Sequence, residues 1–132
     1  MQIIQVADRR VFTTDSGGTL LTTTISEHII DVLAANVASV YVLAETPSET
    51  MDVYVKFEHG PDGLNWKGGG TLATLADLSQ GGLYSSDSPF EAMTGMAKIR
   101  VTVDVVDDGT PDAFGSVALS IWVVLKPFSL VS

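Results

Sequence analysis

The residue types that carry most enzyme chemistry are sparse in this sequence of 132 residues. Its two histidines, His28 and His59, lie far apart, and a metal or acid–base site at either would need further ligands from elsewhere in the chain. Cysteine is absent, which excludes disulfides, thiol catalysis and thiolate zinc sites. No serine lies in a Gly-x-Ser-x-Gly elbow, and Gly68–Gly70 lacks the Lys-Ser/Thr of a phosphate loop. We therefore expect no enzyme activity and no cofactor.

Carboxylates gather in one segment, Asp107–Asp112, at the end of an expected strand. Calcium-binding loops of β-sandwiches have a similar concentration of acidic residues, but this segment lacks the ligand spacing of an EF-hand. Oxygen-rich turns with Asp, Gly and Pro are also common without a metal. We expect a surface turn here and no metal site.

Aromatic side chains offer a different kind of site, a platform on which sugar rings stack. Trp66 follows Asp62 and Asn65, whose polar groups could bind sugar hydroxyls, and Tyr54 is a further aromatic candidate. A tryptophan just past a hairpin turn also commonly folds back to close the end of a sandwich. The candidate contact residues for a ligand or partner are Asp62, Asn65, Trp66, Tyr84 and Trp122.

The composition favours one apolar domain that associates with other proteins. Hydrophobic residues make up 45% of the chain and charged residues 17%, with a mean hydropathy of +0.30. No apolar run is long enough for a membrane helix, and the N-terminus lacks the pattern of a secretory signal. The excess of apolar residues indicates either a surface buried in an assembly or a β-rich core with few charges. The net charge of −9 and the scattered basic residues argue against nucleic-acid binding.

The elements that would position these residues are strands. Asp52–Glu58 alternates apolar and polar residues with the two-residue period of a strand, and Gly60–Gly63 then forms a strong turn. Residues 97–105 show the clearest alternation, and residues 114–125 place Trp122 on the face opposite the core.

Three other segments carry more specific expectations. Val40–Leu43 leaves neither face polar, which predicts a central strand of residues 37–45 with both faces covered. Glu27–Leu33 could form a short helix, but its β-branched residues favour a strand. Lys67–Gly70 is expected to be too flexible for regular structure, and Ser79–Pro89 is expected to be a long surface loop.

Seven or more short strands separated by Gly, Pro and Asp predict an all-β fold, an antiparallel β-sandwich of the jelly-roll type. We expect residues 25–132 to form the sandwich and residues 1–24 to be an extended N-terminal arm. That arm either pairs within its own sheet or lies across a neighbouring subunit.

The order of these features resembles a known group of proteins. A strand leads into Gly60-Pro61-Asp62-Gly63-Leu64-Asn65-Trp66, then a glycine-rich segment, an Ile99-Arg100-Val101 strand and a closing valine-rich strand. This order resembles small β-sandwich virion proteins of tailed bacteriophages, in which a Ser-Pro-Asp-Gly-x-Asn-Trp turn precedes an Ile-Arg-Val strand. The resemblance covers about residues 37–126. Gly60 stands where the group usually has serine, and the same turn occurs in sugar-binding sandwiches related to discoidin domains.

The resemblance implies a non-enzymatic structural role, that of a capsid decoration (cement) protein that stabilises the phage head. It implies the major capsid protein as a partner, a homo-oligomer (a trimer), and a place on the capsid surface of a virion assembled in the host cytoplasm. The alternatives are a carbohydrate-binding module for adhesion to the host surface and a structural component of the tail or the head–tail junction.

Overall fold

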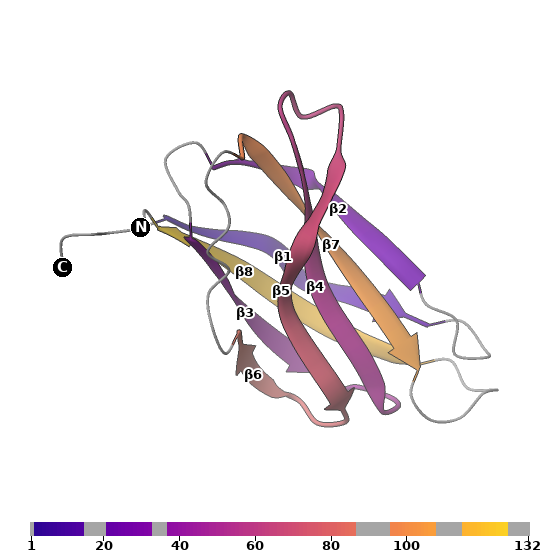
Figure 1. Cartoon of the computed structure of the whole chain (residues 1–132). Coiled ribbons are helices and arrows are strands. Elements are labelled where there is room, and N and C mark those ends of the chain that lie inside the picture. Colours follow the sequence, from indigo (N-terminus) through magenta and orange to yellow (C-terminus); the bar gives the residue numbers. More distant parts are fainter. Residues whose placement is uncertain (1, 15–20, 33–36, 87–95, 108–114, 127–132) are drawn as a thin grey trace.

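Every regular element among the described residues is a strand (Figure 1). The computed structural model describes residues 2–14, 21–32, 37–86, 96–107 and 115–126. Within these ranges the strands are β1 (Gln2–Thr13), β2 (Leu21–Asp31), β3 (Val37–Glu45), β4 (Met51–Gly60), β5 (Lys67–Leu78), β6 (Gly82–Ser85), β7 (Lys98–Asp107) and β8 (Ser116–Lys126).

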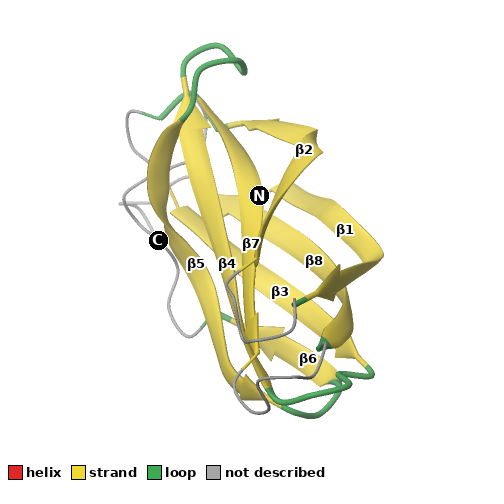
Figure 2. Ribbon diagram, turned by 90° about the vertical axis from the view of Figure 1, so that its right-hand side faces the viewer, coloured by secondary structure: helices red, strands yellow, loops and turns green. Residues whose placement is uncertain are grey.

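These strands form two four-stranded antiparallel sheets that lie face to face (Figure 2). Sheet A has the order β1-β8-β3-β6, and sheet B has the order β2-β7-β4-β5. Each sheet thus combines strands from both halves of the chain, and the first strand pairs with the last. This strand order is that of a jelly roll, in which two Greek keys share one core. The expected all-β antiparallel sandwich is confirmed.

The core lies between the sheets and follows the alternation seen in the sequence. Val53, Val55 and Phe57 of β4 are buried, while the residues between them are partly exposed. On β7 and β8 the inward positions are filled almost entirely by valine, isoleucine and leucine. These branched side chains suit a pleated surface and fill the space between the sheets without polar atoms.

The glycines of Lys67–Gly70 begin a regular strand, so the expectation of an irregular segment there is wrong. They form the start of β5, which pairs with β4 through residues such as Phe57 and Gly70. The reason is steric: a side chain at Gly69 would collide with the Phe57 ring, which covers this part of the strand. Glycine here makes room for an aromatic neighbour. Likewise, the expected loop Ser79–Pro89 contains the short strand β6.

Residues 2–13 belong to the sandwich itself. They form β1, which pairs antiparallel with β8 from Gln2 opposite Leu125 to Thr13 opposite Ser116. Val6 and Phe12 of this strand are buried in the core. Of the two arrangements open for the N-terminal segment, the described residues show pairing within the chain's own sheet. The boundary expected at residue 24 falls inside β2. The residues of Glu27–Leu33 that belong to β2 form a strand and not the short helix that was the alternative.

Strand β3 is central, as expected, and its outward face is covered only in part. It lies between β8 and β6, and Val40 and Val42 are fully buried on its inward face. On the outward face Val37 is buried at one end, whereas Tyr41 is 46% exposed in the middle. The expectation that both faces are covered is therefore wrong at Tyr41, where no described element packs on the outside of sheet A.

Candidate functional site

Three of the five candidate contact residues meet at the tip of the β4–β5 hairpin. Asp62 Oδ1 accepts hydrogen bonds from the backbone N–H groups of Asn65 (2.8 Å) and Leu64 (2.9 Å). Its Oδ2 accepts a third bond, at 2.6 Å, from the side-chain amide of Asn65. These bonds, the Asn65 N–H first among them, lower the pKa of the Asp62 carboxyl. The polar groups of Asp62 and Asn65 therefore hold the turn together and are largely occupied by each other.

Trp66 folds back onto the sheet from this turn. The Arg100 guanidinium lies 4.5 Å from the centre of the Trp66 ring, and Arg100 Nε is 2.9 Å from Glu58 Oε1. The turn closes tightly because residue 60 is glycine: a side chain there would collide with the carbonyl oxygen of Asn65. A small hollow of about 370 Å³ remains beside the ring. The tip thus acts mainly as a packed turn, and one face of Trp66 is already covered by a cation.

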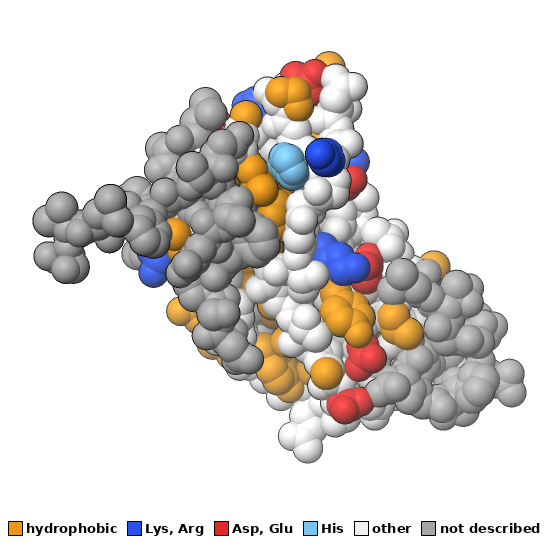
Figure 3. All heavy atoms as spheres, in the orientation of Figure 1, with side chains coloured by type: hydrophobic (Ala, Val, Ile, Leu, Met, Phe, Trp, Pro, Cys, Tyr) orange, Lys and Arg blue, Asp and Glu red, His pale blue; other side chains and the backbone are white. Residues whose placement is uncertain are grey.

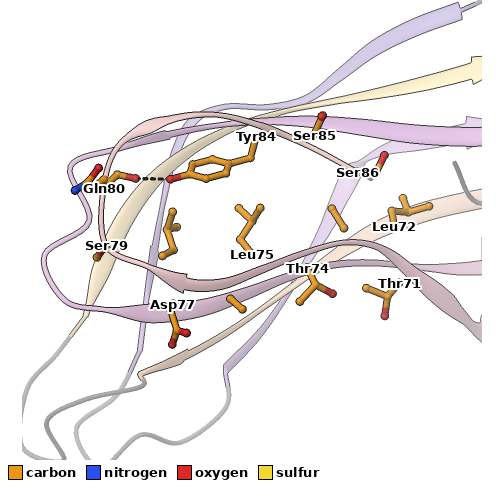
Figure 4. A pocket seen from close by; sticks show the side chains of 13 residues that line it. Thr71, Leu72, Thr74, Leu75, Asp77, Ser79, Gln80, Tyr84, Ser85 and Ser86 are labelled. Carbon is orange, nitrogen blue, oxygen red and sulfur yellow. Dashed lines mark hydrogen bonds between the residues drawn. The ribbon is translucent and has the colours of Figure 1, made fainter. Parts of the chain in front are cut away.

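Tyr84 lies elsewhere, at the opening between the free edges of the two sheets. Figure 4 shows its ring pointing toward Gln80, and its hydroxyl donates a hydrogen bond to the carbonyl of Gln80 at 2.9 Å. A groove of about 600 Å³ follows this opening. Tyr84 therefore does not extend the hairpin site.

Trp122 lies on the outside of sheet A, in the middle of β8. It is paired across the sheet with Gln5 of β1 and with Tyr41 of β3. The five candidate residues thus occupy three separate places, and no single ligand site joins them.

The surroundings of Trp122 form a feature that sequence reasoning saw only in part. Each of the four strands of sheet A carries at least one large apolar side chain on its outward face, among polar ones, and several are strongly exposed: Leu83 at 65%, Val11 at 63% and Ile3 at 59%. We name this surface the apolar face; it consists of Ile3, Val11, Tyr41, Leu43, Leu83 and Trp122. The sequence signals for it were the doubly apolar run in β3, the outward position of Trp122 and the apolar composition.

The outer face of sheet B has the opposite character. Lys56 Nζ lies 2.8 Å from Asp104 Oδ2, and the Arg100–Glu58 pair lies one step along the same strands. Figure 3 looks onto this face and shows basic and acidic side chains next to one another, with apolar groups beside them. The alternation of the sequence predicted that these residues face outward, but their pairing depends on the register between β4 and β7.

The described residues contain no group of three or more His or acidic side chains that could hold a metal ion. His59 ends β4 beside the hairpin hollow, and His28 lies on the exposed part of β2. Most of Asp107–Asp112, where calcium was the alternative, lies outside the described residues. Nor do the described ranges include a helix that could span a membrane.

No protein-family model and no curated protein sequence matches the chain. Its fold is nevertheless similar to that of proteins in infectious bursal disease virus particles. The Gx strain structure has a TM-score of 0.65 at 14% identity over 92% of this chain and 30% of that chain. Virus-derived T=1 particles give a TM-score of 0.64 at 16% identity over 92% and 30% of the two chains. The VP2 subviral particle gives 0.59 at 16% identity over 96% and 32%.

At these identities the likeness shows a shared fold. The chain spans about a third of the length of each of these virus proteins. The comparison therefore adds that part of a protein from a virus particle has the same fold as this chain.

Proposed function

We propose that this protein is a non-enzymatic structural component of a virion, a decoration (cement) protein on the capsid of a tailed phage. The apolar face of sheet A is the observation that carries the proposal. Soluble monomers rarely leave many large apolar side chains together on one surface, so such a surface indicates a protein–protein contact. The similarity in fold to virus-particle proteins supports the same class of function.

The partners that follow are the major capsid protein and further copies of this chain, as in a trimer on the outer capsid surface. One specific contact needs about 800 Å² from each partner. A four-stranded sheet face about 20 Å across and 30 Å long supplies roughly that area. Repetition over the shell adds avidity, so even modest single contacts would stabilise the particle. Assembly would take place in the host cytoplasm.

Replacing Leu83 with glutamate tests the apolar face. Leu83 is 65% exposed, so Leu83→Glu should fold normally but place a charge in the contact. We expect its co-sedimentation with shells of the same virus's major capsid protein to weaken by about tenfold or more. Light scattering should show a smaller oligomer as well.

Leu64 provides the matched control, because it is 82% exposed but lies at the hairpin tip on the other sheet. Leu64→Glu should bind shells and oligomerise like the unchanged protein. Full binding by Leu83→Glu, or a strict monomer that never attaches to shells, would contradict the proposal. Attachment to purified tails with none to shells would favour the tail or head–tail alternative.

A further inference from the structure

The outer face of sheet B contains a groove of about 530 Å³ that the structural role does not use. Hydroxyl side chains from three strands line it: Thr22 and Thr24 from β2, Thr71 from β5 and Thr102 from β7. Lys56 and Asp104 line it as well, and no side chain rises from the glycines of β5 at its edge. The groove is therefore walled by polar groups that stand on rigid, hydrogen-bonded strands.

Asp104 is the unusual member of this set. Its side chain is only 6% exposed, and Oδ2 accepts from the ammonium of Lys56 at 2.8 Å. Oδ1 is buried and has no hydrogen-bond partner. Among the described residues it is the only buried side-chain nitrogen or oxygen that lacks a partner. By contrast, the buried hydroxyls of Thr14 and Ser120 each accept a backbone N–H. A buried carboxylate oxygen without a donor is costly, so this acceptor is a position where a ligand hydroxyl gains more than it would in water.

The charges in and beside the groove indicate a neutral ligand. Lys56 and Arg100 are balanced by Asp104 and Glu58, each paired within the face. An anion would meet the two carboxylates, and a cation would meet the lysine. The groups that the groove offers a neutral ligand are the acceptor Asp104 Oδ1, the ammonium donor of Lys56, and threonine hydroxyls that can both donate and accept hydrogen bonds.

We propose that this groove binds a saccharide, with neighbouring sugar hydroxyls bonded to Asp104 Oδ1 and Lys56. The Lys56 ammonium also lies 5.7 Å from the centre of the Tyr54 ring, so it contacts an aromatic face as well as Asp104. Binding requires the side chain of Lys56, which is 41% exposed, to shift far enough to uncover Oδ1 while its ammonium stays beside Asp104. This site differs from the Trp66 hairpin, where Asp62 and Asn65 already bond each other, and its existence does not depend on the capsid role.

Nuclear magnetic resonance of the full chain tests the site. Soluble oligosaccharides of glucose, galactose, mannose and N-acetylglucosamine are the probes, and arginine and phosphate are the charged comparisons. We expect at least one sugar to shift the amide signals of Thr22, Thr24, Lys56 and Asp104, and neither charged probe to do so.

Thr24→Val should weaken sugar binding about five- to tenfold, the usual loss for one hydrogen bond, without lowering the melting temperature. Lys56→Met should weaken it by a similar factor, but it also leaves the buried Asp104 carboxylate without its ammonium partner, so its melting temperature should fall. Thr13→Val is the matched control, because Thr13 is an exposed threonine on sheet A and its loss should leave binding unchanged. Three results would each overturn the proposal: no shift with any sugar at millimolar concentration, shifts confined to the Trp66 hairpin, or binding by arginine or phosphate in place of sugar.

Discussion

The Asp62 carboxylate holds the β4–β5 turn, and its pKa lies below the ordinary value because the Asn65 and Leu64 N–H groups stabilise its charged form. A lowered pKa in the folded protein means that this contribution is complete above the pKa of the unfolded chain, about 3.9. It is lost as the pH falls through the lower folded pKa. We expect the Leu64 and Asn65 amides to lose protection against exchange in that acidic range, measured against an unstructured peptide at the same pH.

Carboxyl titration by nuclear magnetic resonance measures this directly. The Asp62 midpoint should lie below that of an unstructured peptide with the same turn sequence. In Asp62→Asn the exchange of the two amides should no longer depend on this titration. A midpoint equal to that of the peptide would show that the three hydrogen bonds do not persist in solution.

Gly69 is a residue at which a small change should be felt strongly. A methyl group there collides with the Phe57 ring, which is 2% exposed and cannot move freely. We expect Gly69→Ala to lower the free energy of unfolding by about 1–3 kcal/mol, as other overpacked sites do. Urea unfolding checks this value.

A second substitution separates the collision from a general effect of losing glycine. Phe57→Leu removes the ring edge, so the cost of Gly69→Ala should be smaller in that background, giving a coupling between the two sites. Gly68→Ala is the control, because a side chain at Gly68 meets nothing within 4 Å. Equal costs of Gly69→Ala with and without the ring would contradict the steric account.

At the scale of elements, β1 is a strand of the sandwich core, whereas an extended arm was expected for residues 1–24. Phe12 is 2% exposed and belongs to the central core. Phe12→Ala should cost about 3–5 kcal/mol of unfolding free energy, and deletion of residues 1–24 should abolish cooperative unfolding. Thermal unfolding followed by circular dichroism measures both. A deleted chain that still melts in one sharp transition would show that β1 is dispensable for the fold.

The strands that sequence predicted best are those with strict alternation. The alternation of apolar and polar residues correctly predicted strands β4, β7 and β8 within residues 52–58, 97–105 and 114–125, because one face of each strand meets the core. The start of β5 was missed because glycine propensity outweighed a contact with Phe57 that only the register reveals. Likewise, β6 is a strand of four residues that depends on β3 for its pairing.

The candidate site was predictable only in its local part. Asp62, Asn65 and Trp66 are close in sequence and meet at the tip, whereas Tyr84 and Trp122 depend on which sheet their strands join. A period of two tells which residues share a face but not whether a second layer covers it, so the openness of sheet A was not foreseen. The Lys56–Asp104 pair joins strands far apart in the chain and has no local signal.

At the scale of the whole molecule, the two outer faces divide the surface by chemistry. The outside of sheet A carries exposed large apolar side chains and one ion pair, Arg9–Glu45, whereas the outside of sheet B carries two ion pairs and threonines. With a net charge of −9, random association between copies is opposed by repulsion. Contact through the apolar face would leave the groove of sheet B pointing away from the shell, so both proposed surfaces could be used at once.

The pairing of the first strand with the last also has a mechanical consequence. Gln2 lies opposite Leu125, so β1 enters and β8 leaves at the same end of one antiparallel ladder. Tension applied between these two residues acts across the strands and loads their hydrogen bonds one after another, like a zipper. The sandwich should therefore open at low force when pulled by its ends, although it would resist forces spread over its faces. If the protein is attached to a shell through a sheet face and not through its ends, the force on it is spread over that face, which is the direction in which the sandwich resists opening.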